Sequence, residues 1–322
     1  MFSYNDVFMK NYEVLINPVH TSQYQHHYPT YLYNTVPHLN QQQKGEQISF
    51  FLLHTKKQCL EATFHLFVQH KAGYSPGQAP FGGIEFAPEL RLEVLQFFWQ
   101  TVEGYLQKKA VDSIQIKLYA HCYHPENAQV LQYLWLQQGF RIIEHNLNYH
   151  ININATPLSN RMHLSEKRRL RKCETLGYKF EVWTTPDFDF VHRFISQCRQ
   201  RKGFPISLSL EAFQHLYVQF PQNFTLFTLC HQQRVIALAT GVRVNADVLY
   251  YFLPADDAGY LSASPMVALL ASMYAYGQQQ GYKLFDLGIS TEFSLPNHGL
   301  INFKKRMGAE ASLKLTFFKQ YG

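Results

Sequence analysis

The chain has 322 residues, of which 46% are hydrophobic and 16% are charged, and its formal net charge is +6. A usual domain has roughly 150 residues, so the length predicts about two domains, and so high an apolar content excludes intrinsic disorder. The charge permits ligands that carry phosphate but does not require nucleic acid.

No run of about 18 apolar residues occurs, and the N-terminus lacks the basic and apolar segments of a secretion signal. The five cysteines are odd in number and widely scattered, which is typical of free thiols in a reducing compartment. We therefore expect a cytoplasmic protein without a membrane span. His121, Cys122 and His124 lie close together but lack a second cluster at ligand spacing, so no metal site is expected.

The elements expected in the first half follow a simple order. A β-hairpin is predicted because two apolar runs flank a polar turn. The full order is a hairpin at residues 49–68, a helix with Leu95, Phe98, Trp99, Val102 and Leu106 on one face, a strand at 113–118, a short helix at 127–139 and a strand at 141–153.

The second half repeats this order at an offset of 176 residues, since residues 225–244 match the hydrophobic pattern of residues 49–68. Ser264 and Pro265 form the expected start of the long helix. A strand at 283–287, a short helix at 297–308 and a strand at 312–319 follow. Domain-scale duplication explains this repeat, and residues 45–150 and 221–322 are expected to superpose.

A linker is expected at residues 157–161, so the predicted domains are 1–156 and 157–322. The second domain opens with a basic helix, followed by a strand at 178–183 and helices at 188–201 and 208–218. A hairpin followed by a helical crossover brings antiparallel and parallel strands together, so both sheets are expected to be mixed.

This order of elements resembles the GNAT acyltransferase fold, and LQQGF at residues 136–140 is similar to part of its fourth helix. YKLFDLG at residues 282–288 and GLINFKK at 299–305, followed by Gly308 and Glu310, resemble the closing segment of the FemAB and FemX peptidyltransferases. SEKRRLRK at residues 165–172 is similar to their basic helix. The resemblance covers roughly residues 45–322 and implies an α/β (mixed α+β) protein of two tandem GNAT-like domains. The helical hairpin that some Fem proteins insert has no counterpart, which leaves a peptidoglycan acceptor open.

The resemblance also implies where the acyl donor would bind. In GNAT enzymes, the backbone N–H groups of a Gln/Arg-x-x-Gly-x-Gly/Ala turn hold the pyrophosphate of coenzyme A at a helix N-terminus. The equivalent turn departs from this pattern, because it has one glycine and no basic residue. Its candidate donor-binding residues are Gly259, Tyr260, Ser262, Ala263 and Ser264.

Transfer of an acyl group to an amine requires removal of the amine proton and stabilisation of an oxyanion. Lys304 matches the lysine of the Fem Phe-Lys motif, which places it at the reaction centre; alternatively it is a cation at a helix C-terminus. Asp286 ends a strand where GNAT sheets separate, so it is a candidate base or ammonium ligand, or else a turn residue. Glu292 and His298 flank the same loop and complete the candidate catalytic set.

Residues 167–172 hold five cations in six positions. Arg168, Arg171 and Lys172 share one side of a helix and are candidates for binding the phosphate of a nucleotide-linked acceptor or of tRNA. The alternative is a solvated helix face.

The sequence thus predicts an N-acyltransferase that uses an acyl-CoA donor, an amine-bearing acceptor and no metal. A Fem-like transferase that uses aminoacyl-tRNA and acts on a cell-wall precursor or a peptide is the alternative within this class. A catalytically degenerate tandem module that binds a ligand is the alternative of another class. No oligomeric state is predicted.

Overall fold

The structure, a computed structural model, describes residues 10–19, 24–42, 44–203, 208–292 and 294–321. By its internal contacts the chain divides into two compact units. Unit 1 comprises Met1–Asn146 and Leu313–Gly322, and unit 2 comprises Leu147–Ser312.

Unit 1 is a mixed sheet with helices packed on it. Its strands are β1 (Tyr12–Ile16), β2 (Gln25–His26), β3 (Glu46–His54), β4 (Cys59–Gln69), β5 (Ala72–Ser75), β6 (Gly83–Phe86), β7 (Ser113–Lys117) and most of β16 (Glu310–Gln320). Its helices are α2 (Val36–Leu39), α3 (Leu92–Lys108) and α4 (Pro125–Gln137), with short 3₁₀ turns η1 (Leu32–Asn34) and η2 (His121–Tyr123). β3 and β4 form the predicted antiparallel hairpin, whereas β5 pairs with β7 in parallel.

Unit 2 has its sheet in the order β8-β13-β12-β11-β10-β9. These strands are β8 (Arg141–Asn152), β9 (Lys179–Trp183), β10 (Phe224–His231), β11 (Arg234–Arg243), β12 (Val248–Asp256) and β13 (Leu284–Ile289), with a small ribbon of β14 (Thr291–Glu292) and β15 (Leu295–Pro296). Its helices are α5 (Leu164–Thr175), α6 (Phe188–Arg201), α7 (Leu210–Gln219), α8 (Pro265–Gln279) and α9 (His298–Arg306), with 3₁₀ turns η3 (Leu158–Asn160) and η4 (Ala258–Ala263).

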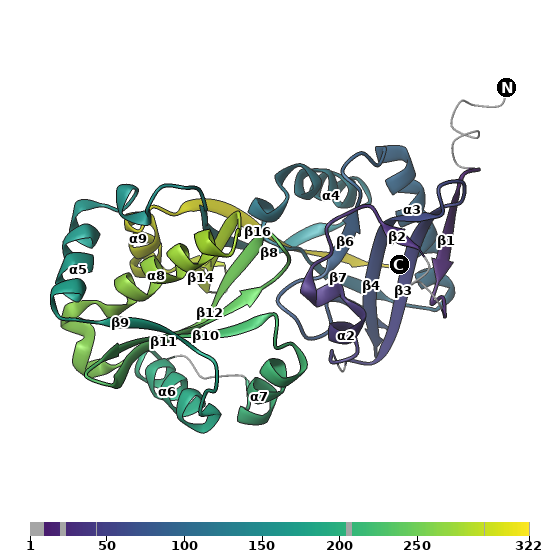
Figure 1. Cartoon of the computed structure of the whole chain (residues 1–322). Helices are drawn as coiled ribbons and strands as arrows, with labels where there is room; N and C mark the ends of the chain where they lie inside the picture. The colour runs from purple at the N-terminus through teal and green to yellow at the C-terminus, as the bar shows by residue number, and fades with distance from the viewer. Residues whose placement is uncertain (1–9, 20–23, 43, 204–207, 293, 322) are drawn as a thin grey trace. The chain divides into compact units, whose positions relative to one another are not determined.

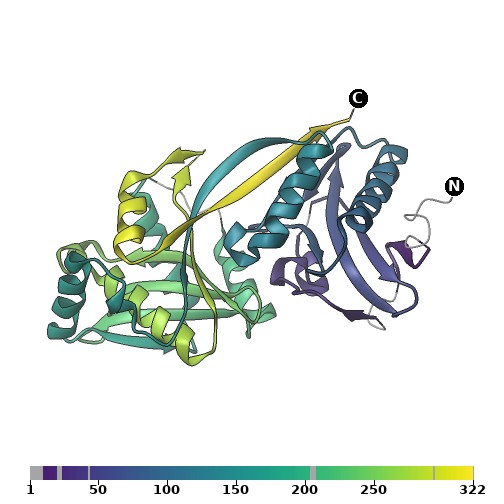
Figure 2. The same cartoon turned by 90° about the horizontal axis from the view of Figure 1, so that it is seen from above.

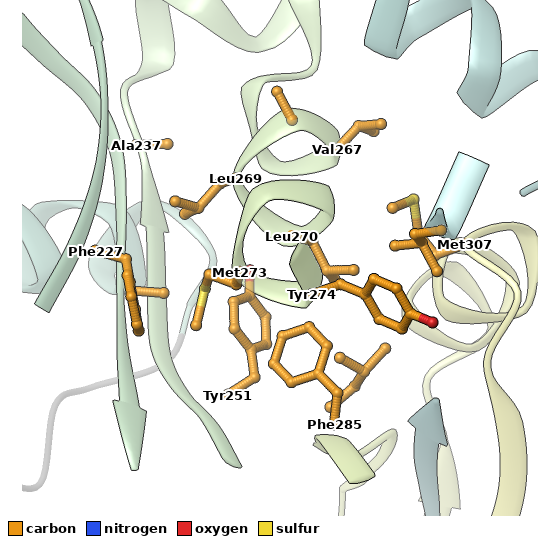
Figure 3. Close-up of a cluster of buried hydrophobic side chains, with 14 of the residues drawn as sticks. Phe227, Ala237, Tyr251, Val267, Leu269, Leu270, Met273, Tyr274, Phe285 and Met307 are labelled. Carbon is orange, nitrogen blue, oxygen red and sulfur yellow. The ribbon is translucent and has the colours of Figure 1, made fainter. Parts of the chain in front are cut away.

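Helices cover both faces of the unit 2 sheet. In Figure 1, α6 and α7 lie on one face of strands β9 to β12, and α5 and α8 lie on the other. Figure 3 shows the core on the α8 side, where Phe227, Met273 and Phe285 meet and are fully buried. α8 can lie in the middle of this core because its side chains are apolar on most of its circumference.

The last strand of each half of the chain is exchanged. β8 follows the helix of the first half, yet its residues 148–152 pair with β13 of unit 2. β16 ends the second half, yet it pairs with β7 of unit 1. Figure 2 shows β8 (teal) and β16 (yellow) side by side, and they are hydrogen-bonded neighbours in the sheet.

The mixed α/β fold class is confirmed, and the strand pairing is mixed in both units, since β5–β7 and β12–β13 are parallel pairs among antiparallel neighbours. The expectation of two separate sheets is wrong, because pairing of β16 with β8 makes one 14-stranded sheet of the described strands. The contact-based division differs from the predicted boundary between residues 156 and 157, because unit 2 already begins at Leu147 and the chain returns to unit 1 at Leu313. Strand pairing between distant segments causes this difference. As limits of independently folding domains, 1–156 and 157–322 stay a prediction, as does the superposition of residues 45–150 and 221–322.

Candidate active site

The candidate site lies where β12 and β13 separate. The two strands pair in parallel from Val248–Leu284 to Tyr250–Asp286, and the structure gives no further pair between them in the part of the chain that it describes. β12 runs on to Asp256 through an irregular register against β11, where Leu253 has a φ of 48°. Such a bulge bends a strand, so it directs β12 away from β13 and opens the sheet.

A pocket of about 280 Å³ lies in unit 2 beside this opening. It is lined mainly by apolar side chains, together with two cations and one carboxylate: Tyr251, Pro254, Leu261, Pro265, Met266, Val267, Leu300 and Phe303 with Ser264, Arg169, Lys202 and Asp256. Ser264 and Pro265 belong to the predicted donor loop, and Phe303 directly precedes Lys304. The pocket therefore joins two of the predicted site segments.

Lys304 is buried, with 3% of its surface exposed. Its Nζ donates hydrogen bonds to the carbonyl oxygens of Gly288, at 2.8 Å, and Ile289, at 2.9 Å, at the end of β13. Burial lowers the pKa of Lys304 from 10.5 to about 7, although Asp286 acts in the opposite direction. An ammonium has three N–H donors, so one remains for another acceptor. Lys304 is therefore not a solvated cation at a helix end, and its role at a reaction centre stays a prediction.

Asp286 lies in a polar row that crosses three strands. In the strand register it stands opposite Tyr250 of β12 and His150 of β8, and directly opposite residues share one face of a sheet. Its Oδ1 accepts hydrogen bonds from Asn148 Nδ2, at 2.7 Å, and from the amide of Gly288, at 2.8 Å. These bonds stabilise the carboxylate, which suits it to hold a neighbouring positive charge.

His150 is a buried base beside this carboxylate, with 8% of its surface exposed. Its Nδ1 has no hydrogen-bond partner among the described residues. Burial lowers the pKa of His150, while Asp286, Glu310 and a hydrogen bond to the Glu310 backbone act to raise it. Because the hydrogen bond to Glu310 raises the pKa, it is one in which the ring donates an N–H to the Glu310 carbonyl oxygen. Nδ1 has no partner in the described part of the chain, so the donor is Nε2, which therefore carries the proton. The lone pair of Nδ1 is then available as a proton acceptor.

Glu292 and His298, the two other candidates, are both exposed. Glu292 lies on the β14–β15 ribbon and His298 is the first residue of α9. They stand on the solvent side of the segment that carries Lys304, so the structure gives no reason to group them with the buried Lys304–Asp286–His150 cluster.

The predicted donor loop is a 3₁₀ turn, η4, followed by Ser264 in the left-handed conformation and then α8. Several of its amides already donate within the loop: Gly259 to Asp257 Oδ1, Tyr260 to the Asp257 carbonyl and Ser264 to the Leu261 carbonyl. Fewer N–H groups are therefore free for a pyrophosphate than in the GNAT turn. Ser262 and Ala263 instead present carbonyls to α5, as the next contacts show.

The basic helix α5 packs against this loop. Lys172 Nζ donates to the Ser262 carbonyl at 3.2 Å, and Cys173 Sγ lies 3.2 Å from the Ala263 carbonyl. Arg168 and Arg171 are exposed. All three predicted phosphate-binding cations are thus exposed, and the structure brings one of them, Lys172, to the donor loop.

Sequence reasoning missed Arg169, which lines the 280 Å³ pocket. It pairs at 2.9 Å with Glu166, whose side chain is fully buried. Asn148 and His150 were missed as well. Their signal was available, because Asn146, Asn148 and His150 repeat every second residue and so place a polar stripe on one face of a strand.

Comparisons with known proteins show the fold. Residues 163–305 match the family model of the acetyltransferase (GNAT) domain. A crystal structure of FemX superposes with a TM-score of 0.69 at 13% identity, covering 92% of this chain and 93% of that chain. The chain has a FemX-like GNAT fold.

Two further structures share the fold. The C-terminal domain of a protein named as a lysylphosphatidylglycerol synthetase from Agrobacterium fabrum has a TM-score of 0.54 at 15% identity, covering 81% of this chain and 82% of that one. L-PGS from Bacillus licheniformis has a TM-score of 0.52 at 14% identity, with 80% of each chain covered. A search of curated proteins gives no match.

Metal-binding groups and membrane-spanning helices are both absent from the residues that the structure describes. They contain no group of three or more His, Cys, Asp and Glu side chains placed to hold a metal ion. No described helix is long and apolar enough to cross a membrane.

Proposed function

We propose that this protein transfers an acyl group from an activated donor to an amine. The observation that carries the proposal is Lys304, a buried lysine at the point where β12 and β13 separate. Burying a cation is costly and needs compensation, and here two main-chain carbonyls provide it. Strongly perturbed ionisable groups beside a pocket are typical of functional sites.

The chemistry follows from these positions. The amine nitrogen bonds to the donor carbonyl carbon, and the third N–H of the Lys304 ammonium stabilises the oxyanion that forms. The bond from that carbon to the donor sulfur or oxygen then breaks, and the leaving sulfur or oxygen takes up the proton that the amine has lost to His150. His150 Nδ1 takes the amine proton, and Asp286, opposite it in the register, stabilises the resulting imidazolium. Lys304, Asp286 and His150 thus have separate roles.

Acyl-CoA is the first donor that we propose, since residues 163–305 match a GNAT acetyltransferase model. An aminoacyl-tRNA donor is supported by two observations. The loop that would hold a pyrophosphate uses several amides internally, and α5 places Lys172 against it. The fold also matches structures named FemX and lysylphosphatidylglycerol synthetase.

The first experiment is a thermal-shift panel of coenzyme A, acetyl-CoA and charged tRNA. A ligand at about 100 times its dissociation constant adds roughly 2.7 kcal/mol to the stability of the folded state. The donor that shifts the melting temperature is then tested for turnover with a panel of amines, including nucleotide-linked ones, by following release of the free thiol or the uncharged tRNA.

The decisive variant is Lys304→Met, with Lys305→Met as its matched control. Lys305 is the exposed neighbour on the same helix, so it removes an equal charge without touching the site. Loss of one oxyanion contact typically costs about 3 to 4 kcal/mol, so turnover should fall a hundred- to a thousandfold in Lys304→Met and change little in Lys305→Met. More than about a third of the parent turnover in Lys304→Met would contradict the role, since that difference is under 1 kcal/mol.

A ligand-binding module without catalysis gives a different result. A donor would then shift the melting temperature and remain intact with every amine, and Lys304→Met would leave its binding unchanged.

A further inference from the structure

A second and larger pocket in unit 2, of about 740 Å³, lies beside the 280 Å³ pocket, and Asp256 lines both. Its volume is in the usual range of small-molecule sites. It belongs to a different face of the unit, between α6 and the end of the β10–β11 hairpin. None of the candidate catalytic residues lines it.

One wall of this pocket is aromatic. Trp183, Phe190 and Phe194 line it and are each half-buried. The Trp183 and Phe190 ring centroids lie 6.0 Å apart, and those of Phe190 and Phe194 lie 5.8 Å apart. Aromatic side chains that line a pocket without being covered by other residues offer a surface on which a planar ring can stack.

Two arginines also line the pocket, together with Asp187, Asp256 and Asp257. Phe190, Phe194 and Arg201 project from one side of α6 because they are spaced by about whole turns, so the helix leads from the aromatic wall to Arg201. Arg234, at the start of β11, adds a second guanidinium.

Both arginines keep donors for a ligand. The hydrogen bonds of Arg201 to Asp256 and of Arg234 to Asp257 run from Nη2, and no bond from Nε or Nη1 of either residue occurs among the described residues. Asp256 is shared between Arg201 and Lys202, at 3.1 Å from the lysine, and Arg234 pairs with Asp257. Near the end of α6 three cations therefore face two carboxylates, which leaves one positive charge in surplus, while Asp187 lies at the other end of this helix. Free guanidinium N–H groups beside a surplus charge suit a phosphate.

We propose that the 740 Å³ pocket binds the adenosine phosphate end of the acyl donor, with the base on the aromatic wall and a phosphate at Arg201 and Arg234. A stacking wall on one side and guanidinium groups on the other match the two ends of a nucleotide. The choice of adenosine rests on the proposed function, because both acyl-CoA and the acylated end of tRNA carry adenosine. Asp256 lines both pockets, so the nucleotide end would lie next to the 280 Å³ pocket that contains part of the predicted donor loop.

The experiment uses the full chain and tryptophan fluorescence. Trp99 and Trp135 are fully buried in unit 1, so of the three tryptophans only Trp183 can meet a ligand in this pocket. AMP and adenosine 3′,5′-bisphosphate are the probes, with inorganic phosphate as a control that cannot stack. Both nucleotides should quench the fluorescence in a saturable way. Calorimetry measures the same binding independently.

Three variants test the walls. Trp183→Leu should weaken nucleotide binding by about 5- to 150-fold, as loss of one stacking partner does, while Trp183→Phe should keep most of the affinity. Arg234→Gln should weaken it about tenfold or more, since a hydrogen bond to a charged group is lost. Arg243→Gln is the matched control, because it removes an exposed arginine from the other end of the same strand.

The two probes distinguish the donors. Tighter binding of the bisphosphate, which is the end of coenzyme A, favours acyl-CoA, and equal or tighter binding of AMP favours the end of tRNA. Absence of saturable binding of either nucleotide at millimolar concentration, by fluorescence and by calorimetry, would overturn the proposal. Equal affinities in Trp183→Leu and the parent would do the same. Turnover without such binding would refute only this pocket, and binding without turnover would refute only the proposed function.

Discussion

Lys304 should reduce the stability of the protein at neutral pH, which can be measured before any substrate is known. Lowering its pKa from 10.5 to about 7 corresponds to an upper limit of about 5 kcal/mol of unfavourable free energy in the folded state. Lys304→Met removes this term. It also leaves the carbonyls of Gly288 and Ile289 without their donor, at about 1 to 3 kcal/mol each. The two effects oppose each other, so the variant should remain within about 3 kcal/mol of the parent at pH 7.

The pH dependence of stability isolates the cost of burying the charged form of Lys304. Because the folded-state pKa is lower than that of the unfolded chain, the unfolded state binds more protons between about pH 7 and 10.5, and stability rises with pH in this window. The penalty is fully present below about pH 7. The difference in unfolding free energy between the parent and Lys304→Met should therefore shift by about 4 kcal/mol in favour of the parent from pH 7 to pH 10.

Urea unfolding at several pH values measures this difference, with Lys305→Met as the control whose difference from the parent should stay constant. A constant difference for Lys304→Met as well would refute the reasoning, since Lys304 would then titrate as an exposed lysine does. Such a result would also remove the argument that this residue is strained for function.

Three other variants test separate parts of the structure. Glu85 is buried, and burial raises its pKa to about 8, so the stability of the protein should fall as the pH rises from about 4.5 through 8. Glu85→Gln should therefore unfold at a higher urea concentration than the parent at pH 9 but not at pH 4. If tRNA is the donor, the double variant Arg168→Gln, Arg171→Gln should bind charged tRNA more weakly, and the binding should depend less on salt concentration. Binding of acyl-CoA in a direct titration should change little, because both side chains are exposed and line neither pocket. Gly308→Ala should lower the unfolding free energy by more than Gly203→Ala does. Both glycines have a positive φ, but only the Cβ added at Gly308 would lie 2.8 Å from its nearest atom. Equal losses of unfolding free energy would show that this contact does not matter.

The elements of this fold are largely predictable because their signals are local. The hairpin of β3 and β4 and the helix α6 are encoded by alternating and helical patterns within about 20 residues. Lys304 could be singled out because the Phe-Lys motif places it on a short helix after β13. Its burial could not, since that depends on the Gly288 and Ile289 carbonyls from another element.

The parts that sequence reasoning missed depend on pairing between distant segments. His150 becomes a site residue only because β8 lies against β13 and so faces Asp286, which is 136 positions later in the chain. Arg169 was read as one cation of a basic run, yet the fully buried Glu166 directs it to the pocket at the start of α8. Periodicity places Asn148 and His150 on one polar face of a strand, but it does not tell which strand lies beside that face.

The exchange of β8 and β16 makes a prediction about where the chain can be cut. A fragment of residues 157–322 begins at the linker that the sequence indicates, but it lacks β8. Leu284, Phe285 and Asp286 then keep their partners on β12 and lose those on β8. It also loses Tyr149 and Ile151 from the core, each worth about 1.5 to 3 kcal/mol of burial, against a total stability of about 5 to 15 kcal/mol for a usual domain. We expect this fragment to lack a cooperative thermal transition and residues 147–312, which keep the paired part of β8, to have one. Circular dichroism of the two fragments decides, and equally sharp transitions would show that β8 is dispensable and that the linker is the true domain boundary.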